Sequence, residues 1–261
     1  MRVFDFNAAI ARTPGASVVR GLRAHSGPSP DLAALQGEHR SCIAALEMAG
    51  VRVSVLPALE QFPDSVFVED PALVFTGGAI LLRPCASSRL GEAAELLPAL
   101  AARFPEVLQI GEGFADGGDV LVTPREILIG LSARTDALGA AALQTHLRAF
   151  GMHSRVVTVP RGTLHLKTDC CLIDEETLLA TEGLAASGLL EGYRVLTVPD
   201  TERPATNAVR VNDHVLMRAG CPRTFDLLSR HGVTAVPLPT DEIAKIDAGL
   251  SCMSLRWFDR R

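Results

Sequence analysis

The sequence has 261 residues, of which 48% are hydrophobic and 21% are charged. This composition indicates a folded globular protein and excludes an intrinsically disordered chain. Lys and Arg together number 25 and Asp and Glu together number 30, so the net charge is −5. A mildly acidic chain without a basic block argues against nucleic acid or an anionic membrane surface as a partner.

The sequence also lacks the signals of membrane insertion and export. No apolar run approaches the roughly 20 residues that span a bilayer, and Asp5 lies where a signal peptide would be apolar. The six cysteines show no CxxC spacing, so they predict neither a zinc site nor a dense disulfide framework. We therefore expect a cytoplasmic protein with no membrane partner.

A pattern that recurs five times along the chain is the most informative feature: a helix-like stretch, then a β-branched run, then Pro or Gly. The helices are expected over residues 31–50, 92–103, 136–150, 184–190 and 222–231. Gly50, Gly151, Gly192 and Gly232 are expected to end four of them. The strands that follow are expected over residues 51–57, 106–111, 155–160, 193–199 and 233–239.

Further short apolar runs lie between each of these strands and the next helix. They predict strands at residues 66–68, 79–82, 120–122, 127–129, 170–173 and 209–211. Each unit then holds about three strands and one helix. Five such units predict an α/β fold of the five-bladed propeller type, with ββαβ-like repeats around a central pocket and a single domain over residues 1–261. An ordinary α/β sandwich whose strand endings recur by chance is the alternative.

A polar or reactive residue follows each of the five strand endings. These residues are Asp64 with Glu69 and Asp70, then Asp116 with Asp119, then His165, Asn207 and Cys252. In a radial arrangement, equivalent positions face one axis, so side chains far apart in sequence would meet in one pocket.

The residue types in that pocket indicate thiol chemistry on a cationic carbon. A cysteine is a nucleophile as its thiolate, and an imidazole can give a proton to a leaving group. Carboxylates beside a thiol raise its pKa, whereas a bound guanidinium would reverse that effect. Each residue also has a plainer interpretation, since Cys252 could be a core cysteine and His165 a structural histidine. Arg89 and Arg134 could clamp a substrate carboxylate or be surface charges.

Five motifs in combination resemble the dimethylarginine dimethylaminohydrolase family, which belongs to the guanidine-modifying superfamily of five-bladed α/β propellers (penteins). The motifs are FPDSVFVED at residues 62–70, DGGDVL at 116–121, GLSART at 130–135, LHLK at 164–167 and LSCMS at 250–254. The resemblance covers essentially the full chain, and the fold that it implies agrees with the repeat.

The resemblance implies hydrolysis of Nω-methylated L-arginine to L-citrulline and methylamine or dimethylamine, without a metal or other cofactor. It implies that Cys252 is the nucleophile, that His165 protonates the leaving amine, and that Asp116 holds the guanidinium. The partner would be a small guanidino amino acid.

The resemblance also implies a set of substrate-binding residues. Arg89 and Arg134 would grip the α-carboxylate, and the backbone near Ile246 would take the α-amino group. Leu22 would lie on an N-terminal flap, within a segment (residues 12–30) whose Gly, Pro and Ser content suits a lid. The remaining members, which would contact cationic groups or orient the site, are Asp64, Glu69 and Asp70.

Two other functions remain open. One is arginine deiminase or amidinotransferase chemistry, whose enzymes typically place an acid two residues after the histidine. Lys167 occupies that position here, which favours a methylated arginine. The other is a non-catalytic propeller that binds a macromolecule, which the acidic net charge and the complete thiol, imidazole and acid set argue against. A homodimer is compatible with the sequence.

Overall fold

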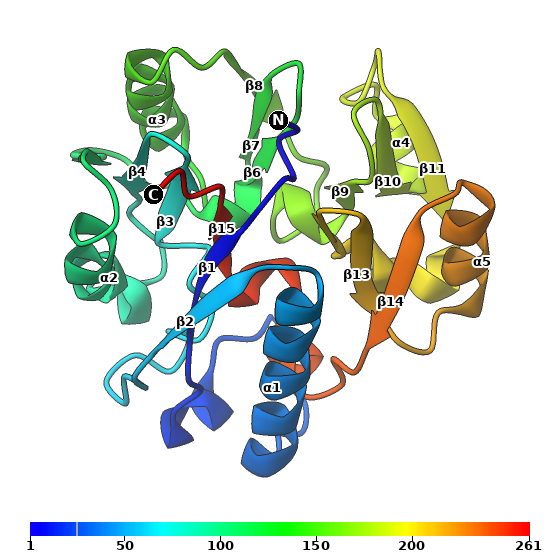
Figure 1. Cartoon of the computed structure of the whole chain (residues 1–261), viewed down its shortest axis with the longest axis horizontal. Helices are drawn as coiled ribbons and strands as arrows, with labels where there is room; N and C mark the ends of the chain where they lie inside the picture. The colour runs from blue at the N-terminus through cyan, green and yellow to red at the C-terminus, as the bar shows by residue number, and fades with distance from the viewer. Residues whose placement is uncertain (25) are drawn as a thin grey trace.

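Five small sheets arranged around one axis form the molecule. In the computed structural model, which describes residues 1–24 and 26–261, fifteen strands make five three-stranded sheets within the described residues. Figure 1 shows the sheets as blades around the centre, with the helices on the outside. The blades, each written from its inner to its outer strand, are β15 (Leu255–Trp257), β1 (Ala8–Arg12) and β2 (Arg52–Leu56); β3 (Ala72–Phe75), β4 (Gly78–Leu81) and β5 (Val107–Gln109); β6 (Val120–Val122), β7 (Ile127–Leu131) and β8 (Ser154–Thr158); β9 (Cys170–Leu172), β10 (Thr177–Thr181) and β11 (Arg194–Val198); β12 (Val209–Val211), β13 (His214–Arg218) and β14 (Thr234–Leu238).

One helix connects the middle strand of each blade to its outer strand. These helices are α1 (Leu32–Met48), α2 (Glu92–Ala101), α3 (Ala137–Ala149), α4 (Glu182–Ala186) and α5 (Pro222–Arg230). The middle and outer strands are parallel, as a helical crossover requires, whereas the inner and middle strands are antiparallel. Gly50, Gly151, Gly192 and Gly232 all have positive φ, which favours glycine over residues with a side chain. Gly192 does not end its helix as expected, because α4 ends at Ala186.

The five-bladed ββαβ propeller predicted from the sequence is confirmed, but one predicted strand is wrong. Residues 66–68 form turns, and the inner strand of that blade is β3, which begins at Ala72. Phe67 explains the difference, because its N–H donates to the Asp64 carbonyl at 2.9 Å and its carbonyl accepts from the Arg89 side chain at 3.0 Å. Both backbone groups of Phe67 are therefore used in the turn and cannot pair with a neighbouring strand. The single domain over residues 1–261 stays a prediction.

The first blade is assembled from both ends of the described chain. Strand β15 pairs antiparallel with β1, with Leu255 opposite Ile10, so the ring closes only when these two segments meet. Helix α2 packs onto this junction, since its Leu96 and Leu100 share a buried cluster with Ile10 and Trp257. Among the described residues, none of the helices combines the length and the apolar character that crossing a bilayer would need.

Candidate active site

The candidate residues lie in the loops that lead into the inner strands. Asp70 precedes β3, Asp116 precedes β6, His165 precedes β9 and Cys252 precedes β15. The inner strands occupy the same position in every blade (Figure 1). The ligand atoms of Asp70, Asp116 and His165 lie within 4.8 Å of one another, and the charge of Asp70 acts on the Cys252 thiol. The structure thus brings together side chains from four blades, as the repeat predicted.

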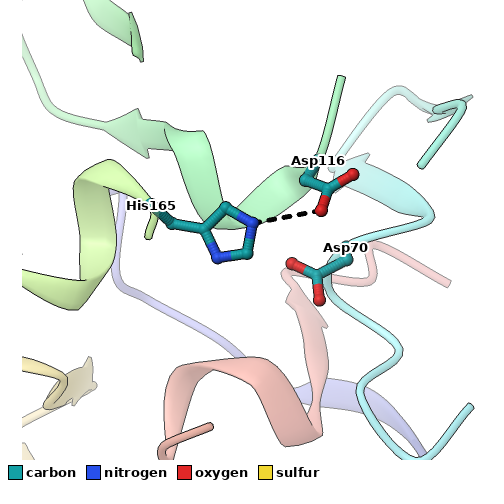
Figure 2. A group of neighbouring side chains, drawn as sticks. All are labelled: Asp70, Asp116 and His165. Carbon is teal, nitrogen blue, oxygen red and sulfur yellow. Dashed lines mark hydrogen bonds and ion pairs between the residues drawn. The ribbon is translucent and has the colours of Figure 1, made fainter. Parts of the chain in front are cut away.

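His165 and Asp116 form a buried pair. Figure 2 shows the imidazole Nε2 bonded to the Asp116 Oδ2 at 3.0 Å, with the Asp70 carboxylate beside both. Burial alone would lower the pKa of His165, but the hydrogen bond to Asp116 and the charges of Asp70, Asp119 and Asp116 outweigh it and raise that pKa. These surroundings therefore favour the protonated form of the imidazole.

Two glycines allow this close approach. A Cβ on Gly117 would lie 2.0 Å from the Glu69 carbonyl oxygen, and a Cβ on Gly118 would lie 2.7 Å from the imidazole of His165. Neither position leaves room for a side chain. The DGGD motif is therefore a packing requirement of the site as well as a turn.

The Asp116 carboxylate is only half satisfied. Its Oδ1 atom is buried and has no hydrogen-bond partner among the described residues. A buried acceptor without a donor is costly, so this atom is suited to a ligand that brings an N–H group.

Cys252 lies in a 3₁₀ turn (Ser251–Met253) just before β15 and is 8% exposed. Its carbonyl accepts from the Glu69 N–H at 3.2 Å, which places the turn beside the Asp70 loop. Burial, together with the charges of Asp70 and Glu69, raises the pKa of the Cys252 thiol to about 12. The thiol is therefore protonated at neutral pH unless a cation enters.

Glu69 is tied into an ion cluster. Its Oε1 atom lies 2.7 Å from the Lys167 Nζ and 3.0 Å from the Arg256 Nη2. All three side chains are almost completely buried. Its Oε2 atom is buried without a hydrogen-bond partner among the described residues, so the arrangement is compatible with both roles expected for Glu69.

Asn207, which precedes β12, links the Cys252 loop to the His165 loop. Its Oδ1 accepts from the Ser251 N–H at 3.2 Å, and its Nδ2 donates to the Lys167 carbonyl at 3.3 Å. Ser251 is adjacent to Cys252, and Lys167 lies two residues after His165. The sequence pattern placed Asn207 in the pocket but did not suggest this bridging contact.

Arg89 lies at the floor of the site in a buried ion-pair network. Its Nη1 lies 2.5 Å from the Asp70 Oδ2, and its Nη2 lies 2.7 Å from the Glu92 Oε2. Burial raises the pKa of Asp70, but the charge of Arg89 outweighs this and lowers it. Nη1 has one partner among the described residues, so one of its N–H groups can still donate to a ligand.

The remaining candidates are Arg134, Asp64, Leu22 and Ile246, and three of them are in contact around Asp64 and Gly21. Arg134 is half-buried in the loop after β7, and its charge acts on Asp64. The Asp64 Oδ1 accepts from the Leu22 N–H at 2.9 Å. Ile246 lies against Gly21, next to Leu22. Burial raises the pKa of Asp64, and Arg89 and the Leu22 N–H partly offset this rise.

Asp70, Asp116 and His165 offer ligand atoms that all lie within 4.8 Å of one another. This spacing suits a single cation. A guanidinium fits the set because it would bring an N–H group to the unpartnered Asp116 oxygen. The expectation that no metal or cofactor is needed stays a prediction.

A cavity of about 640 Å³ lies behind the site. Glu69, Lys167, Ser251 and Arg256 contribute to its lining, together with strands of the inner ring, but the four candidate reacting residues do not. The Lys167–Glu69 ion pair is thus shared between this cavity and the site.

Sequence reasoning missed the residues that support the site. Glu92 is the partner of Arg89, and only their spacing of three residues hinted at it. Arg256 pairs with Glu69 across 187 residues, and no local pattern signals that contact. Asp119 was noted beside Asp116 without a role, yet its carboxylate accepts three hydrogen bonds.

Comparison with known proteins places these motifs in a family. The family model described as arginine deiminase matches residues 58–216. The chain is 38% identical to the N(G),N(G)-dimethylarginine dimethylaminohydrolase of Pseudomonas aeruginosa, with 97% of this chain and 100% of that protein covered. It is 32% identical to the protein of the same name from Streptomyces coelicolor, with 95% and 96% covered.

A solved structure of the Pseudomonas aeruginosa enzyme, a cysteine-to-serine mutant complexed with citrulline, superposes with a TM-score of 0.94 at 37% identity and covers 97% of this chain and 100% of that one. A histidine-to-glycine dimethylarginine dimethylaminohydrolase in an adduct with S-methyl-L-thiocitrulline superposes with a TM-score of 0.93 at 37% identity, with 96% and 99% covered. By its sequence identity over nearly its whole length, the chain belongs to the dimethylarginine dimethylaminohydrolase family.

Proposed function

We propose that this protein hydrolyses Nω-methylated L-arginine to L-citrulline and methylamine or dimethylamine. The observation that carries the proposal is a set of three buried groups, Asp70, Asp116 and His165, whose ligand atoms lie within 4.8 Å of one another and whose Asp116 Oδ1 has no partner among the described residues. The charges of Asp70 and Glu69 also raise the pKa of the Cys252 thiol, so a positively charged ligand would favour its thiolate. The citrulline bound by the Pseudomonas aeruginosa relative supports the same product.

The substrate's two ends would bind to different parts of the site. Asp116 and Asp70 would receive the guanidinium, with the free Asp116 Oδ1 accepting one of its N–H groups. Arg134 and the remaining Nη1 donor of Arg89 would bind the α-carboxylate, because guanidinium groups match carboxylate geometry.

The α-amino group would lie near Asp64 and the backbone at Ile246. Leu22 would cover the substrate from the N-terminal segment, since the Asp64 carboxylate already holds the Leu22 N–H.

The first half-reaction begins when the guanidinium binds. Its charge lowers the pKa of the Cys252 thiol, and the thiol proton leaves to solvent. The thiolate then attacks the guanidinium carbon, so an S–C bond forms and a tetrahedral adduct results. The C–N bond to the methylated nitrogen breaks, and the departing amine takes a proton from the His165 imidazolium.

The second half-reaction releases citrulline. A water molecule attacks the carbon of the covalent thiouronium and gives a proton to the now neutral His165. The C–S bond breaks and its electron pair returns to the sulfur as thiolate. The oxygen that came from water loses its second proton to solvent, which leaves the neutral ureido group of citrulline. The carbon keeps its oxidation state throughout, so the steps need no redox partner.

Arginine deiminase chemistry is the second candidate, favoured by the family model that matches residues 58–216. The Lys167 side chain counts against it. Its Nζ points to Glu69 at 2.7 Å, so this position adds no acid to hold an unsubstituted guanidinium nitrogen.

The test compares citrulline release from asymmetric dimethylarginine, monomethylarginine and arginine by the parent and by Cys252→Ser. We expect release from the methylated forms, at a higher kcat/KM than from arginine, and loss of release in the variant. Cys85→Ser is the matched control, because Cys85 is half-exposed and has no role here. Citrulline release by Cys252→Ser at the parental rate would contradict the mechanism. A higher kcat/KM for arginine than for its methylated forms would contradict the proposed substrate. A homodimer and a cytoplasmic location are further parts of this proposal.

A further inference from the structure

Asp119 is a completely buried carboxylate that accepts three hydrogen bonds from two other segments of the site. Its Oδ1 accepts from the Leu166 N–H at 2.9 Å. Its Oδ2 accepts from the Ser132 hydroxyl at 2.6 Å and from the Thr135 hydroxyl at 2.7 Å. All three partners donate, which is the pattern that an ionised carboxylate requires.

Each of these partners adjoins a residue with a proposed role. Leu166 follows His165 directly, and Ser132 and Thr135 lie on either side of Arg134. The Thr135 hydroxyl also accepts from the Asp116 N–H at 3.1 Å. Ser132 continues the network toward Arg134, because its hydroxyl accepts from the Arg134 N–H at 2.9 Å.

We propose that Asp119 is a positioning residue that sets the imidazole of His165 and the guanidinium of Arg134 at a fixed distance from each other. This inference rests on the proposed function, in which one group serves the reacting end of the substrate and the other its α-carboxylate. Since the substrate spans both, an error in their spacing misplaces the reacting carbon.

The charge of Asp119 gives it an effect that a purely structural contact would lack. Asp119 is one of three carboxylates whose charges act on the His165 imidazole, the others being Asp70 and Asp116. Replacing Asp119 by Asn should therefore lower the pKa of His165 as well as loosen the loops. A buried carboxylate costs more than a neutral residue of the same shape, which is a reason to expect a use for the charge.

The experiment uses three variants of the full chain. Asp119→Asn removes the charge and keeps the shape, and Thr135→Val removes the hydroxyl but keeps the charge. Thr123→Val is the matched control, because Thr123 is an equally buried threonine of the same blade whose hydroxyl donates to the Glu126 carbonyl, away from the site. Steady-state kinetics with dimethylarginine, thermal unfolding and an NMR titration of the His165 imidazole are measured for each.

We expect Asp119→Asn to lower kcat/KM by roughly 10-fold to 100-fold, with kcat reduced and KM raised. Its imidazole pKa should fall by about one pH unit, because an attracting negative charge has gone. Thr135→Val should lower kcat/KM without moving that pKa, and Thr123→Val should leave both unchanged.

Folded Asp119→Asn with the parental kcat, KM and imidazole pKa would overturn the inference. If Asp119→Asn does not fold, Thr135→Val decides, and kinetics equal to those of Thr123→Val would overturn it. A parent that releases no citrulline would instead reject the proposed function, whereas the NMR titration would still test the charge effect.

Discussion

The site platform (residues 116–119, 132–135 and 165–168) and the N-terminal strap (residues 13–31, described except at residue 25) are held in opposite ways. Buried side chains tie the platform together, with Asp119 as the shared acceptor. The strap is tied by carboxylates of other segments to its backbone N–H groups. Glu60 accepts from Ser17 at 2.8 Å, Glu242 accepts from Asp31 at 2.6 Å, and Asp247 accepts from Ala24.

The difference shows how the site can hold its side chains in a fixed geometry and still admit a ligand. Hydrogen bonds that are shielded from water hold the reacting groups in one geometry. Exposed carboxylate–amide bonds exchange with water more easily, so segments held by them open at a lower free energy. The strap is therefore the part of the site that we expect to move when substrate enters.

The largest expected effect concerns the ion pairs beneath the platform. Arg89→Met would leave Asp70 and Glu92 buried without their cation, which should lower the free energy of unfolding by about 3–5 kcal/mol. Arg155→Met is the control, because its ion pair with Glu126 is partly exposed and should contribute about 1 kcal/mol or less. Urea unfolding measures the free energy of unfolding of both variants. Equal decreases would contradict the expected difference between buried and exposed ion pairs.

The acidic surroundings of Cys252 should make its alkylation depend on the charge of the reagent. With a pKa of about 12, few of the thiols ionise at pH 7.5 in the free protein. A cationic haloacetamidine should therefore label Cys252 at least about 100-fold faster than iodoacetamide, since its charge replaces that of the substrate.

Asp70→Asn sharpens the alkylation test. Removing this negative charge should lower the pKa of the thiol, so the iodoacetamide rate at pH 8 should rise and the preference for the cation should fall. Equal rates for both reagents in the parent protein would mean that the carboxylates do not control the thiol.

The smallest expected effect concerns the strap. Asp64→Ala removes the acceptor of the Leu22 N–H, so KM for dimethylarginine should rise by about tenfold while kcat changes less. Glu60→Gln, at an exposed tie farther from the site, should change KM less than Asp64→Ala. A lowered kcat with an unchanged KM in Asp64→Ala would place Asp64 in the platform instead.

Local signals were enough to predict the frame of the molecule. The alternating runs, four of them after an expected glycine stop, located all five outer strands, and the register of the repeat placed Asp116, His165 and Cys252 in one pocket. Strands β1, β10, β13 and β15 were not predicted. Strand β3 was also missed, because the apolar run just before it, around Phe67, resembles a strand, whereas the Phe67 carbonyl accepts from the Arg89 side chain.

The supporting contacts depend on tertiary structure and had no such signal. Arg89 meets Asp70 across 19 residues, and Glu69 meets Arg256 across 187. From the sequence, these charged side chains could equally have been solvated on the surface or paired in the interior. Predicting them would have required the orientation of each loop around the axis, which periodicity does not fix.

The ring closure described for the first blade also bears on biosynthesis. Cys252 immediately precedes β15, the strand that completes the sheet begun by β1. A ribosome delivers this thiol after every other group of the pocket, and its acidic surroundings arise only when the last strand docks. A nascent chain therefore acquires this thiol in the same step in which β15 pairs with β1, so a chain without that pairing lacks the assembled pocket.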